Sequence, residues 1–223
     1  MLRMDCLKLA APMIGDAPCV VTMGLNWTEW DRVRPSDGNL QVKTLGLASS
    51  IGLGLAVGMP HRKFVVIDGD GAVLMNLSGL VTLGWQRPKN LIHLVFDNKI
   101  YEASGGTPTA SAVNANLKDL ALSAGIRSAH QVEDLDGFAA ILAQSLASDG
   151  PHFIVALVEP SAERPAHPRI DEVEKRNRIR IDEMENRYRF IRYLEGLEGR
   201  HILEYPADLK PKLVGIDLAP LPS

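Results

Sequence analysis

Residues 63–101, KFVVIDGDGAVLMNLSGLVTLGWQRPKNLIHLVFDNKIY, decide how the rest of the chain can be arranged. Two short apolar runs within them, residues 64–67 and 91–96, have the length and the β-branched content of buried strands. Residues 72–86 between the two runs are compatible with a helix, and the RPKN sequence of residues 87–90 favours a turn that ends it. The pattern predicts a strand–helix–strand unit of a parallel α/β sheet.

Polar residues follow each of the two predicted strands. The sequence DGDG (residues 68–71) comes after the first strand, and Asp97 and Asn98 follow the second. In a parallel sheet both clusters fall at the carboxyl edge, which is where open α/β sheets bind ligands. Asp70 and Asn98 offer hard oxygen atoms of the kind that hold Mg²⁺ or Ca²⁺. We therefore expect a divalent cation at this edge.

The same edge suits a phosphate group. Gly69 and Gly71 allow the backbone to bend sharply and to approach a ligand closely. A helix that opens at Ala72 would direct unpaired N–H groups and its positive dipole end at the same place. A metal held by one carboxylate and one amide, beside a helix N-terminus, suits a metal-bridged diphosphate.

A GDG sequence followed about thirty residues later by an asparagine that closes a strand resembles the diphosphate-binding motif of thiamine diphosphate (ThDP) enzymes. The resemblance covers about residues 17–160. In length, and in the YEASGGTPT sequence of residues 101–109, it is most like the small β subunits of the sulfopyruvate and phosphonopyruvate decarboxylase type. It implies a three-layer α/β domain with a parallel sheet that binds ThDP and Mg²⁺.

The resemblance also implies which residues bind the cofactor. The metal ligands would be Asp70, Asn98 and the backbone carbonyl of Ile100. The positions expected around the diphosphate and the metal together are Gly24, Gly69, Asp70, Gly71, Ala72, Asn98, Ile100 and Tyr101. Ala72 departs from the family, in which a hydroxyl residue often adds a hydrogen bond to the diphosphate, but one lost bond need not abolish binding.

Residues 43–46 (KTLG) match a second family motif, which precedes a helix rich in glycine and alanine. In the family, the apolar third residue wedges under the cofactor and bends its two rings into a V shape, so that the cofactor can deprotonate itself. Leu45 is the matching residue. Lys43 stands where glycine is usual, and its backbone carbonyl would face the aminopyrimidine. A dinucleotide-binding loop is rejected here, because Gly52 and Gly54 follow the predicted helix start and not a strand end.

Residues 101–116 are polar and contain glycine, which predicts a loop over the sheet edge. The resemblance places Tyr101, Glu102 and Ser104 on the substrate side of the cofactor. Glu102 and Ser104 are the candidates for catalysis within this chain, although neither matches the usual catalytic acid of the family. A solvated loop is the alternative interpretation of these residues.

The remaining segments extend the α/β pattern. Strands are expected at residues 17–23, at the start of 40–56, and at 126–132 and 152–158; helices are expected in the rest of 40–56 and at 117–124 and 135–147. Residues 1–16 are expected to form a helix or an irregular lead-in, and residues 26–39 a loop or a short helix.

The composition changes after the ThDP-like domain, which we assign to residues 1–160. Residues 161–223 are expected to form a charged helical arm and a proline-containing tail. Within residues 168–199 an apolar stripe has heptad-like spacing, and it includes Met184, Tyr188 and Ile191. A helix cannot bury such a stripe alone, so we expect the arm to pack on another subunit or across its own domain.

The overall composition excludes several classes of protein. A net charge of −3 and a pI near 6.1 give no electrostatic reason to expect a nucleic acid or an anionic membrane as a partner. Cys6 and Cys19 are too few for a disulfide framework or a four-thiolate cluster. No apolar run approaches the ~20 residues that span a bilayer. We expect a cytoplasmic protein.

The resemblance implies a ThDP- and Mg²⁺-dependent lyase subunit that decarboxylates a small 2-oxo acid such as sulfopyruvate or phosphonopyruvate. In the family, a glutamate on a separate pyrimidine-binding domain activates the cofactor, and 223 residues leave no room for that domain. We expect a separate α subunit to carry it, in an α₂β₂ or higher assembly. The alternatives are the β subunit of a 2-oxoacid:ferredoxin oxidoreductase, an acetolactate synthase-like subunit, and a non-catalytic subunit of the same fold.

Overall fold

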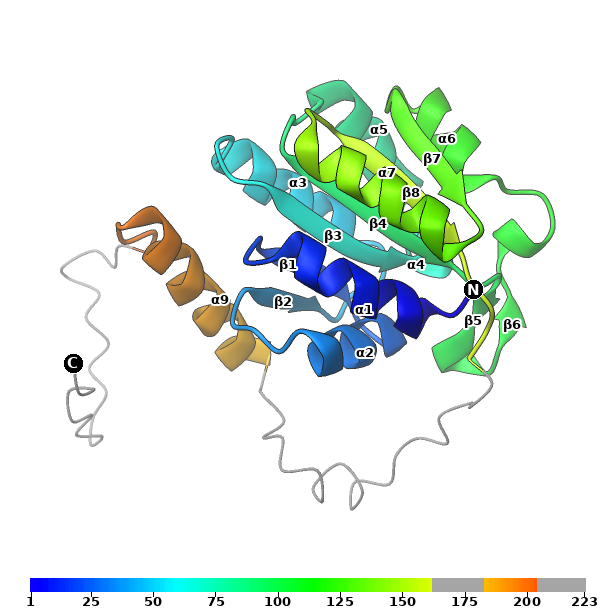
Figure 1. Ribbon diagram of the computed structural model, residues 1–223, viewed down its shortest axis with the longest axis horizontal. Helices are drawn as coiled ribbons and strands as arrows, with labels where there is room; N and C mark the ends of the chain where they lie inside the picture. Colours follow the sequence, from blue (N-terminus) through cyan, green and yellow to red (C-terminus); the bar gives the residue numbers. More distant parts are fainter. Residues whose placement is uncertain (162–182, 204–223) are drawn as a thin grey trace, which may run out of the picture.

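A parallel sheet of six strands forms the centre of the molecule in the computed structural model, which describes residues 1–161 and 183–203 (Figure 1). The sheet strands are β1 (Cys19–Thr22), β2 (Asn39–Val42), β3 (Phe64–Gly69), β4 (Leu91–Asp97), β7 (Ser128–Val132) and β8 (His152–Leu157). A separate antiparallel hairpin consists of β5 (Ile100–Tyr101) and β6 (Thr107–Pro108).

Helices cover both faces of this sheet. The α-helices are α1 (Arg3–Ile14), α2 (Leu25–Val33), α3 (Ala48–Gly58), α4 (Asp70–Met75), α5 (Leu77–Gln86), α6 (Leu117–Ser123), α7 (Leu135–Ala147) and α9 (Glu183–Glu198). Two 3₁₀ turns, η1 (Glu102–Ser104) and η2 (Ala110–Ala112), flank β6. The three-layer parallel α/β fold that the sequence predicts is confirmed.

The strand order, β2-β1-β3-β4-β8-β7, positions the functional residues. The chain leaves β1 toward β2, at one side, and then returns across β1 to β3 and continues toward the other side. The order therefore reverses between β1 and β3, and ligands of open α/β sheets bind at the carboxyl end of such a switch point. Strand β4 pairs in parallel beside β3, so the polar residues after both strands meet at that end.

Alternating side chains of the central strands enter two separate cores. Phe64 and Val66 of β3 pack in the core beneath α3, α5 and α6, whereas Val65 and Ile67 pack in the core beneath α1, α2 and α7. Every residue of β4 is buried. Burial on both faces explains why these strands are continuous apolar runs and not alternating ones.

The predicted helix at residues 72–86 is wrong in one respect, because it is two helices. Helix α4 begins at Asp70, and the chain breaks at Asn76, whose φ of −147° and ψ of 65° are not helical. The Asn76 side chain explains the break: its Nδ2 donates to the carbonyl of Gly46 at 2.8 Å, and its Oδ1 accepts from Ser78 at 2.6 Å. A side chain engaged in this way competes with a continuous helix.

The described part of the C-terminal arm, α9, packs against the edge strand β2 of its own domain. Asn186 accepts a hydrogen bond from the Gln41 N–H at 2.8 Å and donates to the Asn39 carbonyl at 2.9 Å, so it satisfies the strand edge. Met184 and Tyr188 of the predicted apolar stripe are exposed, so in the described residues this part of the stripe does not pack on the chain's own domain. The contact with β2 turns a different face inward, which carries Phe190 and Leu194. The predicted helix before residue 183 and the tail after 203 lie outside the described residues.

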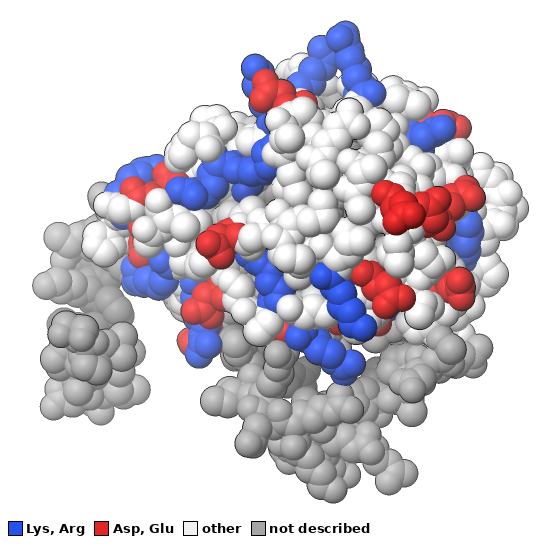
Figure 2. Space-filling model, viewed as in Figure 1, with Lys and Arg blue, Asp and Glu red and all other residues white. Residues whose placement is uncertain are grey.

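Charges of both signs are spread over the face shown in Figure 2, and among its described residues neither sign forms one continuous patch. Within residues 1–161 and 183–203, no helix is both long and apolar enough to cross a membrane.

Candidate functional site

A pocket of about 100 Å³ lies at the carboxyl ends of β1, β3 and β4. It gathers predicted site residues from four separate segments: Gly24, Leu45, Gly69, Asp70, Gly71, Ala72, Asn98, Ile100, Tyr101, Glu102 and Ser104. Lys43 is exposed and does not line this pocket. A larger, more open cavity of about 660 Å³ between the end of α1 and the residues after α2 contains none of the predicted residues. The convergence of polar groups identifies the smaller pocket as the candidate site.

Asp70 is the first residue of α4 and is only 3% exposed. Two hydroxyls from the loop after β6 lie against its Oδ2: Thr109 Oγ1 donates to it at 2.6 Å, and Ser111 Oγ lies 3.1 Å away. Burial raises the pKa of Asp70 above its ordinary value, and the nearby negative charge of Asp97 raises it further. A divalent cation at this carboxylate would stabilise its charged form.

Asp97 is the second buried carboxylate at this edge. The Ser111 hydroxyl lies 2.7 Å from Asp97 Oδ1, so a single side chain links Asp97 to Asp70. Lys99 Nζ lies 3.1 Å from Asp97 Oδ2 and also donates to the Ser111 carbonyl. These contacts fix the loop that follows β6 to the ends of β3 and β4.

Asn98 follows Asp97 and is buried. Its Oδ1 accepts a hydrogen bond from the Ile100 N–H at 3.1 Å, which is an Asx turn, and its Nδ2 donates to Glu102 Oε2 at 3.0 Å. Asp70 and Asn98 lie on adjacent strand ends, as the sequence predicts. Among the described residues no cluster of three His, Cys, Asp or Glu side chains suits a metal ion, so further hard ligands at this site would be backbone carbonyls and the ligand itself.

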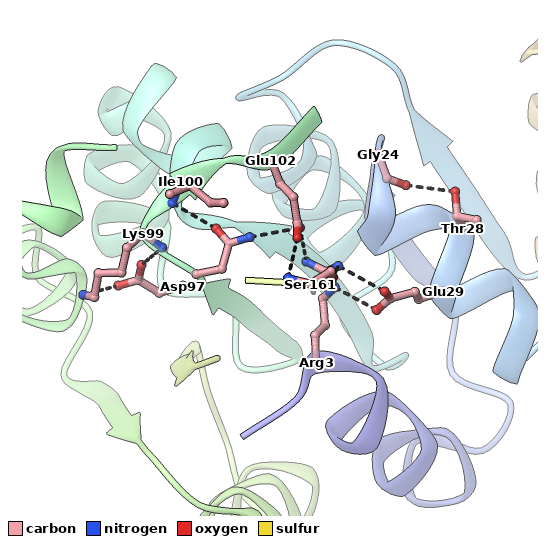
Figure 3. A network of polar contacts seen from close by, with 10 residues as sticks. Arg3, Gly24, Thr28, Glu29, Asp97, Lys99, Ile100, Glu102 and Ser161 are labelled. Carbon is pink, nitrogen blue, oxygen red and sulfur yellow. Dashed lines mark hydrogen bonds and ion pairs between the residues drawn. The ribbon is translucent and has the colours of Figure 1, made fainter. Parts of the chain in front are cut away.

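Glu102 belongs to a buried network of polar contacts (Figure 3). Its Oε2 accepts from Arg3 Nη1 at 3.2 Å as well as from Asn98, and its Oε1 accepts from the Ser161 N–H at 2.6 Å. Arg3 also holds both carboxylate oxygens of Glu29, at 2.8 and 3.1 Å. Both oxygens of Glu102 are thus engaged within the protein. Ser104 is exposed at the pocket.

Two polar side chains that line the pocket were missed by sequence reasoning. Thr22 is the last residue of β1, and Asn26 lies in the first turn of α2. Both are buried, and in the described part of the chain Thr22 Oγ1 and Asn26 Oδ1 have no hydrogen-bond partner. Buried polar atoms are rarely left unpaired, so these two point to a polar ligand. The rule that polar residues at strand ends bind ligands would have found Thr22.

Glycine is required at two positions of the pocket wall. Gly24 has a φ of 86°, which lets the chain turn from β1 into α2. At Gly71, an added Cβ would lie 2.4 Å from Cε1 of Tyr101, so the missing side chain lets the tyrosine ring lie against α4. Leu45 remains 37% exposed at the pocket, although it is a large apolar residue.

These residues fit a magnesium-bound diphosphate. The site offers a buried carboxylate, an amide oxygen and a backbone carbonyl for the metal, and two unpartnered polar atoms beside them. Arg3 and Ser111 were also missed, because they lie outside the quoted motifs and reach the site only through the fold. Thr109 ends the YEASGGTPT sequence, but sequence reasoning gave it no role at the site.

Comparison with known proteins gives a matching family model. Residues 30–156 match the model described as "Thiamine pyrophosphate enzyme, C-terminal TPP binding domain". Two solved structures share the fold: one from Mycobacterium smegmatis entitled a putative thiamin diphosphate-dependent enzyme, and benzoylformate decarboxylase from Polynucleobacter necessarius. Both have a TM-score of 0.60, at 17% and 18% identity, and the matches cover 72% and 73% of this chain and 32% and 34% of the others.

Curated relatives are more similar in sequence. The chain is 36% identical over 175 residues to phosphonopyruvate decarboxylase from Streptomyces viridochromogenes, covering 78% of this chain and 44% of that protein. It is 34% identical over 164 residues to sulfopyruvate decarboxylase subunit beta from Methanocaldococcus jannaschii, covering 73% of this chain and 86% of that subunit. The chain thus spans less than half of the first relative and most of the second.

Proposed function

The chain belongs to the thiamine pyrophosphate enzyme family, and on that premise we propose that it is the diphosphate-binding subunit of a ThDP- and Mg²⁺-dependent decarboxylase of small 2-oxo acids. The observation that carries the proposal is the pairing of Asp70 and Asn98 at the ends of adjacent strands, beside the unpartnered polar atoms of Thr22 and Asn26.

Each part of the pocket has a role in this proposal. Asp70, Asn98 and the Ile100 carbonyl would hold Mg²⁺, the Thr22 hydroxyl would donate a hydrogen bond to the diphosphate, and Asn26 would do so through its amide nitrogen. The backbone at Gly24, Gly69, Gly71 and Ala72 forms the wall against the diphosphate. Leu45 lines the pocket and would support the bound cofactor, and Lys43 would contribute only its carbonyl, consistent with its exposed side chain.

The reaction class follows from the cofactor and from the relatives. Bound ThDP supplies the electron sink that decarboxylation of a 2-oxo acid requires. Relatives at 34–36% identity are named sulfopyruvate or phosphonopyruvate decarboxylases, and the substrate proposed here is a small 2-oxo acid of that kind. Tyr101 and Ser104 line the same pocket and would lie on the substrate side.

The proposal includes a separate α subunit with the pyrimidine-binding domain, in an α₂β₂ or higher assembly. Three of the relatives are named "subunit beta", and the matches span 86%, 82% and 59% of them. Exposed apolar side chains support a partner at the site. Leu45 lines the pocket, and Leu47 and Met75 lie within three residues in sequence of the pocket residues Leu45 and Ala72. Two free, buried cysteines are compatible with the reducing cytoplasm, where we place the assembly.

Release of CO₂ tests the proposed function. The full chain is co-expressed with a pyrimidine-binding α subunit from the same genome, and CO₂ release from sulfopyruvate and from phosphonopyruvate is measured with ThDP and Mg²⁺. We expect turnover of at least one substrate, and loss of turnover in Asp70→Ala. ThDP binding without CO₂ release from either acid would contradict the decarboxylase assignment and favour a non-catalytic subunit or another reaction of the family.

A further inference from the structure

We propose that Arg3 and Glu102 form a positioning unit for Asn98, and that Glu102 orients this amide instead of transferring protons. The role of Asn98 as a metal ligand rests on the proposed function. The contacts from Arg3 to Glu102 and from Asn98 to Glu102 do not, because they are made by the protein alone. Figure 3 shows Arg3 and Glu102 within this network.

The contact between Glu102 and Asn98 specifies the orientation of the amide. An ionised carboxylate can only accept hydrogen bonds, so Glu102 Oε2 must face the nitrogen end of the amide, at 3.0 Å. The oxygen end then faces the opposite way, where it accepts from the Ile100 N–H at 3.1 Å. Without Glu102, only the bond from Ile100 remains to decide which end of Asn98 presents oxygen to a metal.

Arg3 fixes the position of the Glu102 carboxylate, which orients the Asn98 amide. The side chains of Arg3 and Glu102 are only 7% and 9% exposed, and a charge at such depth requires a partner. Glu29 on α2 accepts two hydrogen bonds from the Arg3 guanidinium, from Nε and Nη2, and Nη1 then donates to Glu102. Arg3, on the first turn of α1, is thus linked to Asn98 through one intermediate side chain, that of Glu102.

The network also explains why a proton-transfer role for Glu102 is unfavourable. Three donors engage its two oxygens: Asn98 and Arg3 at Oε2, and the Ser161 N–H at Oε1, 2.6 Å away. Each oxygen is thus already held by a donor of the protein itself. In addition, one arginine and two glutamates leave an excess negative charge next to Asn98, which favours a cation there.

The first test needs neither cofactor nor partner. The side-chain NH₂ signals of Asn98 are recorded by ¹⁵N NMR on the full chain and are assigned with Asn98→Asp. We expect them to shift in Glu102→Gln and in Arg3→Met. The matched control is Arg62→Met, which removes an Arg–Glu pair at Glu198, away from the pocket. Unchanged Asn98 signals in both network variants would overturn the proposal, even if ThDP binds.

The second test uses the complex with the α subunit, and its probes are Mg²⁺ and ThDP. Calorimetric titration of ThDP at graded Mg²⁺ gives the half-saturating Mg²⁺ concentration. Residues that orient metal ligands typically change metal affinity by about 10–100-fold, so we expect a rise of at least about tenfold in Glu102→Gln and less than about threefold in Arg62→Met. If Glu102→Gln does not fold, Arg3→Lys is measured against the same control, with a smaller rise expected.

The dependence on Mg²⁺ separates the two roles of Glu102. A positioning role predicts that cofactor occupancy and turnover of Glu102→Gln recover at saturating Mg²⁺. Wild-type Mg²⁺ affinity with turnover that stays low at saturating Mg²⁺ would overturn the proposal and restore a catalytic role. If the wild-type complex does not bind ThDP, the proposed function fails, whereas the NMR result still decides whether Arg3 and Glu102 orient Asn98.

Discussion

Replacing Asp70 by asparagine should stabilise the cofactor-free protein. The Ser111 hydroxyl lies 3.1 Å from Asp70 Oδ2 and 2.7 Å from Asp97 Oδ1, so the two carboxylates are at most about 6 Å apart. Two like charges at that distance repel by about 3 kcal/mol at an effective dielectric constant of about 20. Lys99 offsets part of this repulsion at Asp97. Asparagine also weakens the two charge-assisted hydrogen bonds from Thr109 and Ser111, by about 0.5–1 kcal/mol each.

We therefore expect a net gain of about 1 kcal/mol in the free energy of unfolding, which corresponds to a rise of roughly 2–4 °C in Tm for a chain of this length. The gain should depend on pH. Because the folded-state pKa of Asp70 is raised, the folded wild type loses stability as pH rises above the ordinary Asp value of about 4. The loss levels off once the pH exceeds the raised pKa. Asp70→Asn should thus differ least from wild type near pH 4 and most near pH 8.

Differential scanning calorimetry in EDTA between pH 4 and pH 8 measures this effect. Asp68→Asn is the matched control, because Asp68 is similarly buried, at the end of β3, but accepts from the Gly69 N–H at 3.0 Å and lies 3.2 Å from His93. That variant should be destabilised. An Asp70→Asn protein no more stable than wild type at pH 8, or a gain that does not change with pH, would refute the reasoning.

Three further predictions concern the fold. Gly84→Ala places a Cβ 1.9 Å from the Ala124 carbonyl oxygen and should lower the free energy of unfolding by about 3 kcal/mol or more. Gly54→Ala, whose added Cβ has nothing within 4 Å, should raise the free energy of unfolding by up to about 1 kcal/mol. Urea unfolding of both variants measures the difference. Asn186→Ala leaves two backbone groups of β2 unpaired and should speed proteolytic removal of α9, and an unchanged cleavage rate would contradict this role. Burial raises the pKa of Cys19 to about 12, so its thiol should react with a disulfide reagent at pH 8 only after unfolding, and rapid reaction of the folded protein would count against it.

Much of the sheet can be predicted from the sequence because its central strands are buried on both faces. That burial makes β3, β4 and β8 apolar runs whose ends are marked by polar residues, and the observed bounds differ from the predicted ones by one or two residues. Helix α7 has the predicted bounds, since its apolar spacing and its Asp134 cap are local signals. Asp70 and Asn98 could be predicted as neighbours for the same reason: parallel strands bring their ends together.

The features that could not be predicted depend on contacts between distant segments. The helix break at Asn76 requires the carbonyl of Gly46. Which face of α9 turns inward depends on its contact with the edge strand β2. Arg3 lies in a helix without any motif, and only the fold brings it to Glu102. Periodicity describes one element at a time, so it contains no information on such pairings.

Calorimetric titration of ThDP into the complex of this chain with its α subunit tests the cofactor site most directly. The proposed site predicts saturable binding in the presence of Mg²⁺, loss of binding in EDTA, and loss of binding in Asp70→Ala even when Mg²⁺ is present. Absence of ThDP binding by the wild-type complex, or binding that neither EDTA nor Asp70→Ala alters, would contradict it.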